Sequence, residues 1–364
     1  MNAIAGAKLT ERRQMDWLLV GSAGLLLIIG LLALYSATGG GSEFKKQLVW
    51  LLVGLPFAYL MYRVDARIWA MYSRLLYTIS AIILLLTKFS FFGKSINEAE
   101  RWFSIGTLMF QPSEPAKLIF IITYADLIAR WKQDFRTLKG FVVSVLFVGV
   151  PFLLVLIQPD LGTSMVFLAL WLGMSLVARQ RLSLLGLVLP LGAIALWGAW
   201  SFGILRDYQV ARWTQFWNGK SYQIEIAILS IGSGQSLGQG YNKGQLKQSG
   251  LVPVQKSDFI FTVIAEETGF IGSALTILTF AFFLWRVWLV VLGAAVPLLR
   301  CMAAGIFIVF AFHTLVNLLM VVGMFPVVGV PLPFCSYGGS KMVLLFAMLG
   351  LLLNIRKSER KLAF

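Results

Sequence analysis

The feature that most constrains this chain is a series of apolar stretches, each long enough to cross a lipid bilayer. A hydrocarbon core of ~30 Å requires ~20 apolar residues in a helix. We therefore predict an all-α polytopic membrane protein with about ten transmembrane helices, forming a single domain over residues 1–364. The predicted spans are 17–36, 47–62, 67–87, 113–130, 141–157, 161–178, 183–203, 258–285, 298–324 and 337–355.

The composition argues against a soluble protein of this size. Hydrophobic residues make up 59% of the chain and charged residues 13%, whereas soluble domains are about 45–50% apolar and about 25% charged. The net charge is +15, but the sequence contains no basic soluble domain with interleaved aromatic residues that could hold nucleic acid. In a polytopic protein such an excess indicates basic inside loops and contact with anionic lipid. We expect membrane lipid, and not nucleic acid, as a partner.

Lys and Arg residues in the short loops predict the orientation of the spans. If the N-terminus lies inside, every inside loop is short and basic, as the positive-inside rule expects, and ten spans return the C-terminus to the inside. The longest loop, 204–257, then lies outside between spans seven and eight, and its basic character indicates an anionic partner there. Within it, Tyr222–Leu229 is amphipathic enough to form a short helix at the interface. The inside positive charges are Lys8, Arg12, Arg13, Arg63, Arg67, Arg130, Lys132, Arg136, Lys139, Arg179, Arg181, Arg286, Arg356, Lys357, Arg360 and Lys361.

Ionisable residues lie at the outer ends of several predicted spans. Glu114 and Lys117 open the fourth span, Asp160 opens the sixth, and Asp258 opens the eighth. A Gly-Gly turn preceded by Ser336 leads into the tenth. Charges at membrane depth are costly and rare, so each is a functional-site hypothesis by default. Because the predicted topology brings them to one side, we expect a single site that faces one compartment.

Most of these charges also have a structural explanation. Glu114 and Asp160 suit the first turn or the N-cap of a helix, and Asp258 could be another cap. Lys117 is harder to explain in this way, because it lies three residues after Glu114 on the same helix face. A lysine one turn inside a span needs an anion, water or a path to the interface.

Several polar residues and prolines lie deeper in the predicted bundle. We expect one of Glu266 and Glu267 to form a structural pair there. His313, the only histidine, is expected to be a satisfied bundle residue rather than a proton relay. The prolines of segment 326–333 predict a broken or re-entrant stretch, which a membrane tolerates only where it lines a cavity within the protein.

An ordered set of motifs over nearly the whole chain resembles the SEDS family (shape, elongation, division and sporulation). One such motif would be weak, but the ordered set is highly specific. The motifs are Arg101-Trp102; Gln111-Pro112-Ser113-Glu114-Pro115-Ala116-Lys117; Gln158-Pro159-Asp160-Leu161-Gly162-Thr163; Ile231-Gly232-Ser233-Gly234; Gly238-Gln239-Gly240; Ser257-Asp258-Phe259-Ile260-Phe261; Ala265-Glu266-Glu267-Thr268-Gly269; Asn317-Leu318-Leu319-Met320; Gly329-Val330-Pro331-Leu332-Pro333-Phe334; and Ser336-Tyr337-Gly338-Gly339-Ser340.

The resemblance implies a peptidoglycan glycosyltransferase. Such proteins polymerise lipid II on the outer face of the bacterial cytoplasmic membrane, together with a class B penicillin-binding protein that cross-links the glycan. Asp258 matches the family's essential aspartate. The chain departs from common family patterns at Lys256-Ser257, where His-Thr is frequent, and at Pro115, but neither departure removes a charged residue. The compact length favours the branch for cell elongation and rod shape over the division branch.

The implied substrate carries a pyrophosphate on a polyprenyl tail, and this chemistry defines a predicted site. Asp258 would be the catalytic carboxylate, since a carboxylate can deprotonate an acceptor hydroxyl. Cations would offset the charge on the leaving diphosphate, and a divalent ion such as Mg²⁺ or Mn²⁺ would serve the same purpose, although the sequence names no metal ligands. The predicted substrate-binding residues are Glu114, Lys117, Asp160, Arg101, Lys256, Ser336 and Ser340.

Two other functions remain open at this stage. The first is a flippase for the same lipid-linked precursor, which Glu266, Glu267 and the broken segment 326–333 would suit. The second is a non-catalytic scaffold that activates a penicillin-binding protein. We expect spans eight and nine and the outer loop to dock that protein, with Ala304 and Ala311 among the small residues that permit close helix approach.

Overall fold

The computed structural model describes residues 15–362, except for 89–92, 97–98, 106–107, 220, 253 and most of 188–206. Helices dominate this part of the chain, so the predicted helical class is confirmed, although a small sheet that we did not predict is also present. The helices of the bundle are α1 (Trp17–Thr38), α2 (Ser42–Arg63), α3 (Ala66–Met71), α4 (Ser73–Lys88), α5 (Ser113–Trp131), α6 (Leu138–Ile157), α7 (Leu161–Val177), α8 (Leu182–Gly186), α13 (Ile260–Gly293), α14 (Pro297–Val321) and α15 (Gly339–Leu362).

The long outer loops also contain secondary structure. Residues 93–110 form an antiparallel three-stranded sheet with the order β1-β2-β3. The predicted interface helix is confirmed as a helix, because α11 covers Tyr222–Ser233. The remaining elements are β1 (Gly93–Ile96), β2 (Ala99–Ile105), β3 (Leu108–Phe110), α10 (Asp207–Trp217) and α12 (Gln245–Gln248), together with a 3₁₀ turn at Lys132–Arg136 between α5 and α6.

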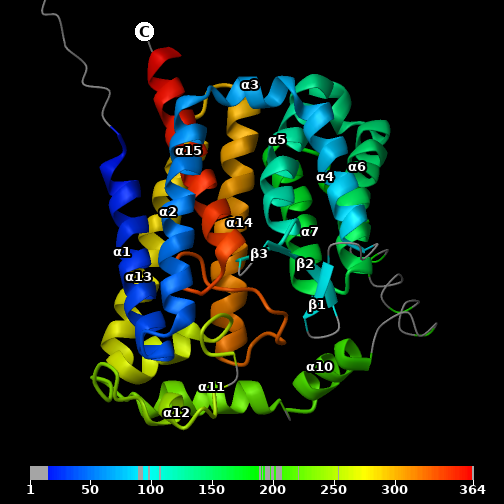
Figure 1. Cartoon of the computed structure of the whole chain (residues 1–364). Coiled ribbons are helices and arrows are strands. Elements are labelled where there is room, and N and C mark those ends of the chain that lie inside the picture. The colour runs from blue at the N-terminus through cyan, green and yellow to red at the C-terminus, as the bar shows by residue number, and fades with distance from the viewer. Residues whose placement is uncertain are drawn as a thin grey trace, which may run out of the picture.

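Several helices have the length and apolar character of a membrane span. Among the described residues, α1, α6, α13, α14 and the stretch Gly339–Ser358 of α15 meet both criteria, and Ser73–Thr87 and Leu161–Val177 are shorter apolar helices. The predicted third span begins too early, because Ala66–Met71 forms the separate helix α3, which crosses one end of the bundle (Figure 1). Most of the predicted seventh span, 183–203, lies outside the described residues. The count of ten spans stays a prediction.

The two ends of the bundle carry the segments that the predicted topology assigns to them. In Figure 1 the C-terminus and α3 lie at the upper end, whereas α10, α11 and α12 run across the lower end, roughly perpendicular to the bundle. The small sheet lies towards the same lower end as the long loop. We call the lower end the outer end, in keeping with the predicted orientation.

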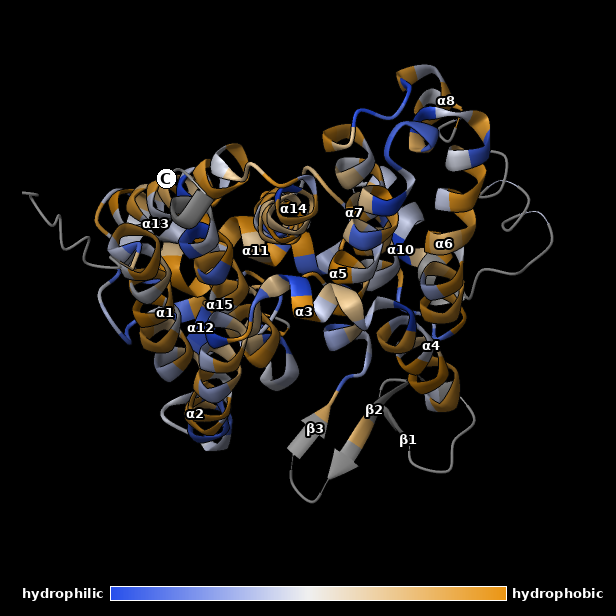
Figure 2. Cartoon of the chain, turned by 90° about the horizontal axis from the view of Figure 1, so that it is seen from above, coloured by the Kyte–Doolittle hydropathy of each residue, from blue (hydrophilic) through white to orange (hydrophobic). Residues whose placement is uncertain are grey.

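Helix α14 occupies the middle of the bundle. It packs against α13 on one side and against α5 and α7 on the other, while α2 packs along α15 and α1 along α13. Seen from above in Figure 2, α1, α2, α13 and α15 lie together on one side of α14, and α4, α6 and α7 lie on the other. Side chains at the outer end of α14 therefore lie between these two groups of helices.

The segment 322–338 connects α14 to α15 without forming a helix, as its prolines predict. Most of it is buried, and Phe334 packs among the aromatic rings of Phe283, Phe310 and Phe346. Gly30 of α1 permits this packing, since a Cβ there would lie 2.3 Å from the Cα of Cys335. The segment therefore runs through the interior of the protein, and we call it the re-entrant segment.

Candidate active site

Glu114 and Lys117 form a buried ion pair at the outer end of α5. Lys117 Nζ lies 2.8 Å from Glu114 Oε2, and each side chain is 1% exposed. Apart from this pair, neither carboxylate oxygen of Glu114 receives a hydrogen bond from a described residue. The predicted pairing on one helix face is thus present. Since taking two charges out of water offsets much of their attraction, stability alone does not account for the pair.

Capping does not explain this helix start. Pro112 occupies the N-cap position, where no side chain makes a capping hydrogen bond. Ser113, which the sequence suggests as a cap, is already helical, and its hydroxyl has no partner among the described residues. Glu114 itself lies in the first turn, as predicted, so only the capping part of the structural explanation is wrong.

A pocket lies beside the ion pair, with about 360 Å³ of space not filled by atoms, a figure that includes open solvent. Its walls come from α5, α14, α15 and the re-entrant segment. The predicted site residues Glu114, Lys117 and Ser336 all line it. The other lining residues are Val309, His313, Pro331, Leu332, Pro333, Gly338, Lys341, Met342, Leu344 and Leu345.

Two side chains of α14 hold the re-entrant segment against this pocket. His313 Nδ1 lies 3.3 Å from the carbonyl oxygen of Pro331, while its Nε2 has no hydrogen-bond partner among the described residues. Asn317 Nδ2 donates to the carbonyl oxygens of Val330 and Asp258, each at 2.8 Å. His313 is therefore only half satisfied, in contrast to our expectation, and it lines the pocket.

Asp258 lies in the turn that immediately precedes α13, next to the re-entrant segment. A Cβ on Gly329 would lie 3.6 Å from Asp258 Oδ2, so the glycine leaves the carboxylate room. Partial burial raises the pKa of Asp258 above the usual carboxyl value, while the positive charges of Lys341 and Arg212 oppose that rise. Asp258 does not line the pocket itself but lies beside it.

The backbone on either side of Asp258 is joined to the start of α15. Ser336 Oγ donates to the carbonyl oxygen of Ser257 at 2.6 Å and accepts from the amide of Leu332 at 2.9 Å. Tyr337 N donates to the carbonyl oxygen of Lys256 at 2.9 Å. The hydroxyl of Ser336 is thus engaged in positioning the backbone, and its predicted contact with substrate stays a prediction.

Asp160 connects the outer ends of three helices. It caps α7 by accepting from Thr163 N at 3.1 Å and from Thr163 Oγ1 at 3.0 Å, which confirms its predicted N-cap role. It also accepts from Gln111 Nε2 at 3.0 Å, and the Gln111 amide donates to Ser340 Oγ at 2.9 Å. Asp160 and Ser340 therefore align α5, α7 and α15 beside the pocket, although neither lines it.

Two predicted binding residues are placed differently. Lys256 Nζ pairs with Glu43 Oε1 at 2.7 Å, so its charge is directed towards the start of α2 and away from the pocket. Arg101 lies on β2, and its side chain is outside the described part of the structure.

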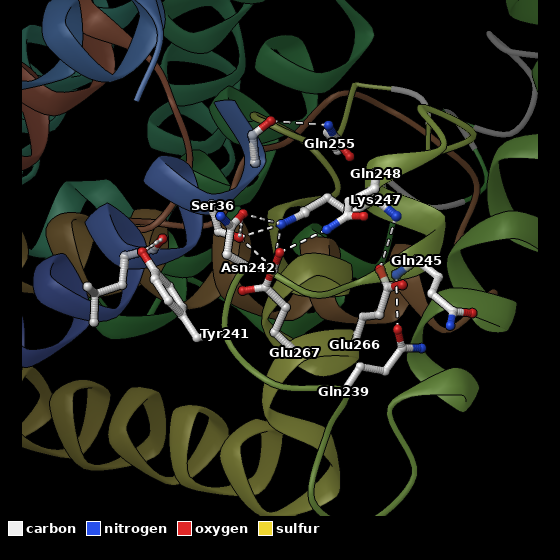
Figure 3. Close-up of polar contacts among 12 residues, drawn as sticks. Ser36, Gln239, Tyr241, Asn242, Gln245, Lys247, Gln248, Gln255, Glu266 and Glu267 are labelled. Atoms are coloured by element: carbon white, nitrogen blue, oxygen red, sulfur yellow. Dashed lines mark hydrogen bonds and ion pairs between the residues drawn. The ribbon is translucent and has the colours of Figure 1, made fainter. Parts of the chain in front are cut away.

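Glu266 and Glu267 form a second buried acidic cluster, shown in Figure 3. Glu267 Oε1 pairs with Lys247 Nζ at 2.7 Å and also accepts a hydrogen bond from Ser36 Oγ. Glu266 accepts from the amides of Leu246 at 2.7 Å and Lys247 at 3.2 Å, at the start of α12. Our prediction of a structural pair is confirmed. We call these residues, with Ser230 and Asn242, the clamp.

The outer loop also repairs a break in α13. Gly269 adopts a non-helical conformation with φ 65° and ψ −161°. The carbonyl oxygens of Glu266 and Glu267 accept from the amides of Gln239 and Gly240 at 3.0 and 3.1 Å. The amides of residues 270 and 271 donate to the carbonyl oxygens of residues 235 and 236 at 2.8 and 3.2 Å. Loop backbone thus replaces the hydrogen bonds that the break removes.

Two basic residues near the site were not singled out from the sequence. Lys341 lines the pocket, and Arg212 of α10 donates to the carbonyl oxygen of Val327 at 3.2 Å. The position of Lys341 directly after the Ser336–Ser340 motif could have drawn attention to it. Arg212 is one of several basic residues of the long loop, and nothing in its sequence context separates it from the others.

In the described part of the chain, no three His, Cys, Asp or Glu side chains are grouped so that they could hold a metal ion. The predicted divalent cation consequently has no site built from these side chains alone. It stays a prediction, and we derive no chemical step through it.

The fold and site define a multi-pass membrane protein with a charged pocket at one end of its helical bundle. The chain belongs to the FtsW, RodA and SpoVE family of cell cycle proteins, whose model matches residues 14–361. This is the SEDS family indicated by the motifs.

Relatives of this chain occur in several bacteria. It is 32% identical to the stage V sporulation protein E of Bacillus subtilis, with 96% of this chain and 99% of that protein covered. It is 31% identical to the peptidoglycan glycosyltransferase MrdB of Escherichia coli, with coverages of 93% and 92%.

Solved structures share the fold. A chain in a peptidoglycan synthase complex that coordinates polymerization and crosslinking is similar with a TM-score of 0.81 and 27% identity, covering 95% of this chain and 98% of that one. The rod shape determining protein RodA of Thermus thermophilus is similar with a TM-score of 0.73 and 26% identity, covering 94% and 97%.

Proposed function

We propose that this protein is a peptidoglycan glycosyltransferase that polymerises lipid II into glycan strands at the outer face of the bacterial cytoplasmic membrane. The observation that carries the proposal is the buried pair of Glu114 and Lys117 in a pocket beside Asp258, in a chain of this family. Several of its relatives are named peptidoglycan glycosyltransferases. Similarity to RodA supports a role in cell elongation and rod shape.

In the proposed reaction, Asp258 acts as the general base. It takes the proton from the acceptor sugar hydroxyl, whose oxygen then bonds to the anomeric carbon of the donor. The bond between that carbon and the diphosphate oxygen breaks, and polyprenyl diphosphate leaves with the electron pair. A base should be partly protected from water and have a pKa nearer the working pH than an ordinary carboxyl group, and the burial of Asp258 favours both.

Lys117 would bind the diphosphate, with Glu114 orienting the ammonium group. An ammonium held in a fixed position stabilises the negative charge that develops on the leaving group, and the effect is larger where water is excluded. Asp160 and Ser340 would be positioning residues, because their hydrogen bonds set the relative positions of the helix ends around the pocket.

The contacts of the clamp weaken the alternative that this protein is a flippase. Glu266 and Glu267, which would suit a transport pathway, are engaged by Lys247, by Ser36 and by backbone amides. A proton or substrate pathway would need these carboxylates to change partners. The pocket charges, by contrast, lie at one end of the bundle.

A class B penicillin-binding protein is the proposed partner, in line with the synthase complex that shares this fold. On α14, Ala304 is 1% exposed and packs inside the bundle, whereas Ala311 is half-buried. Helix α13 offers a better surface, since Phe270, Leu275 and Leu278 are exposed apolar residues along it. We therefore place docking on α13 and the outer loop.

Purified protein, with and without such a partner, would test the proposal on labelled lipid II. We expect glycan polymer on gels with the parent and none with Asp258→Asn. A parallel assay for lipid II scrambling in liposomes separates the flippase, which would move lipid without polymerising it. If only the partner polymerises, and does so equally well with Asp258→Asn, the scaffold function replaces the enzyme.

A further inference from the structure

Lys341 is the second lysine of the pocket. It lies in the first turn of α15, lines the same pocket as Glu114 and Lys117 of α5, and has a partly buried side chain. A Cβ on Gly338 would lie 3.3 Å from Lys341 Cδ, so the glycine leaves space for the lysine stem. Among the described residues Lys341 makes no ion pair. It is close enough to act electrostatically on both Lys117 and Asp258.

The charged groups of the pocket do not balance. Its lining contains one carboxylate, Glu114, and two ammonium groups, Lys117 and Lys341. Glu114 is paired with Lys117 at 2.8 Å, and the carboxylate whose charge reaches Lys341, Asp258, lies beside the pocket and not in its lining, so the lining itself carries a net positive charge. A partly buried ammonium group is costly unless an anion or hydrogen-bond acceptor joins it. The pocket is therefore complementary to an anion.

The neighbouring polar groups are also incompletely used. His313 Nε2 and both oxygens of Glu114 lack hydrogen bonds from described residues, apart from the ion pair itself. The Glu114 oxygens can only accept hydrogen bonds, so they are suited to water or to a donor group such as a sugar hydroxyl and not to the phosphates themselves. The remaining walls are apolar, with Val309, Leu344 and Leu345 among them. The pocket thus combines a cationic region with a surface suited to the start of a lipid chain.

We propose that Lys341 binds the second phosphate of a polyprenyl diphosphate and, together with Lys117, makes the pocket select diphosphates over monophosphates. This inference rests on the proposed function and assigns the ligand's two phosphates to two cations on different helices. A single ammonium group would bind either ligand comparably, because one phosphate is enough to satisfy it. Two separated ammonium groups favour a ligand with two adjacent anionic groups.

Direct binding by the full-length protein in lipid nanodiscs tests the proposal. The probes are a polyprenyl diphosphate, the corresponding monophosphate and inorganic pyrophosphate, and the variants are Lys341→Met and Lys341→Arg. Lys243→Met is the matched control, since Lys243 is an exposed lysine on the outer loop. Hydrogen bonds to charged groups contribute enough that the Lys341→Met change should weaken diphosphate binding about 10- to 100-fold.

The expected pattern is specific. Lys341→Met should lose most of the preference for diphosphate over monophosphate, Lys341→Arg should retain it, and Lys243→Met should bind like the parent. Inorganic pyrophosphate should follow the same order with weaker binding if the headgroup alone is recognised, and should not bind if the lipid chain is required. An unchanged diphosphate preference in Lys341→Met would overturn the proposal.

Polymerisation measured on the same variants keeps this inference separate from the proposed function. If the parent polymerises lipid II and the KM of Lys341→Met for lipid II is unchanged, the role of Lys341 is wrong while the enzyme function stands. If the parent binds diphosphate through Lys341 but never polymerises lipid II, the binding role stands and the enzyme function is wrong.

Discussion

The outer end of the bundle contains two buried acidic clusters, and they differ in how completely their carboxylates are used. In the clamp, Glu266 and Glu267 accept hydrogen bonds from backbone amides, serine hydroxyls and a lysine. In the pocket, Glu114 has its ion pair with Lys117 and no other donor among the described residues. Both clusters contain a buried ion pair. The two clusters therefore do not differ in the burial of their charge, but they differ in how fully their carboxylates are hydrogen-bonded.

The largest effect is expected at Asp258, next to the pocket. Asp258→Asn keeps the shape of the side chain but removes the base, and loss of a general base typically costs about 10²–10⁴-fold in rate. Thermal stability in detergent should stay near that of the parent. Glycan synthesis from lipid II measures the change, and near-normal synthesis would remove Asp258 from the mechanism.

Replacing both members of the pocket pair should separate binding from folding. The double variant Glu114→Gln/Lys117→Met removes both charges, and exchanging a whole buried pair is often neutral for stability. Turnover should nevertheless fall at least about 100-fold, because one oriented cation for the leaving group is lost. Comparing turnover with the melting temperature checks this. Loss of folding with retained specific activity would show that the pair is structural.

In the clamp, by contrast, loss of a charge should reduce the stability of the protein. Lys247→Met leaves Glu267 buried without its cation, and breaking a buried pair in this way costs about 3–5 kcal/mol. Unfolding of the purified variant in detergent measures the loss. The exposed Lys243 provides the control, since Lys243→Met should change stability by less than about 0.5 kcal/mol. Equal stability of both variants would remove the distinction between the two clusters.

Two glycines of the outer loop test how tightly the loop packs against the clamp. Gly238 has φ +81°, and a Cβ there would lie 2.1 Å from the carbonyl oxygen of Glu267. Gly238→Ala should therefore destabilise the protein by more than about 1 kcal/mol. Gly232, within α11, has no atom within 4 Å of its Cβ position, so Gly232→Ala should be neutral or slightly stabilising. Similar melting temperatures for the two variants would argue against tight loop insertion.

The last comparison concerns the pH dependence that Asp258 gives to the site beside the pocket. Asp258 must be unprotonated to act as a base, so kcat/KM should fall tenfold for each pH unit below its pKa. Because burial raises that pKa, the fall should begin at a higher pH than for an ordinary carboxyl group. A pH–rate profile on lipid II measures it. A rate that stays constant down to the range of an exposed carboxylate would contradict the assignment.

Sequence reasoning identified the pocket pair because the spacing of Glu114 and Lys117 fixes a shared helix face. It also identified the re-entrant segment from its prolines. It could not assign Lys256 to Glu43, since that contact joins residues 213 positions apart and depends on the packed bundle. Lys341 escaped notice for a similar reason: a lysine in the first turn of a helix is unremarkable until the opposite wall of the pocket is known.

The small sheet at residues 93–110 was missed for a different reason. Its strands have three to seven residues and lie between two predicted spans, where hydropathy reports only a break in the apolar pattern. The break in α13 was also not predicted. Gly269 alone does not end a helix, and the compensating hydrogen bonds come from a loop about 30 residues earlier.

The hydrogen bonds between the outer loop and the break in α13 couple the two segments, so their amides should become accessible to deuterium together. The amides of residues 239, 240, 270 and 271 are each bonded across the break, two in each direction. Withdrawing the loop would expose all four donors and their acceptors together, in a setting where unsatisfied backbone groups are costly. The four amides should accordingly exchange with deuterium at one common rate, although they belong to segments that are separate in the sequence. During synthesis the loop emerges first, and its glycine-rich backbone has no partner until the residues around Gly269 follow.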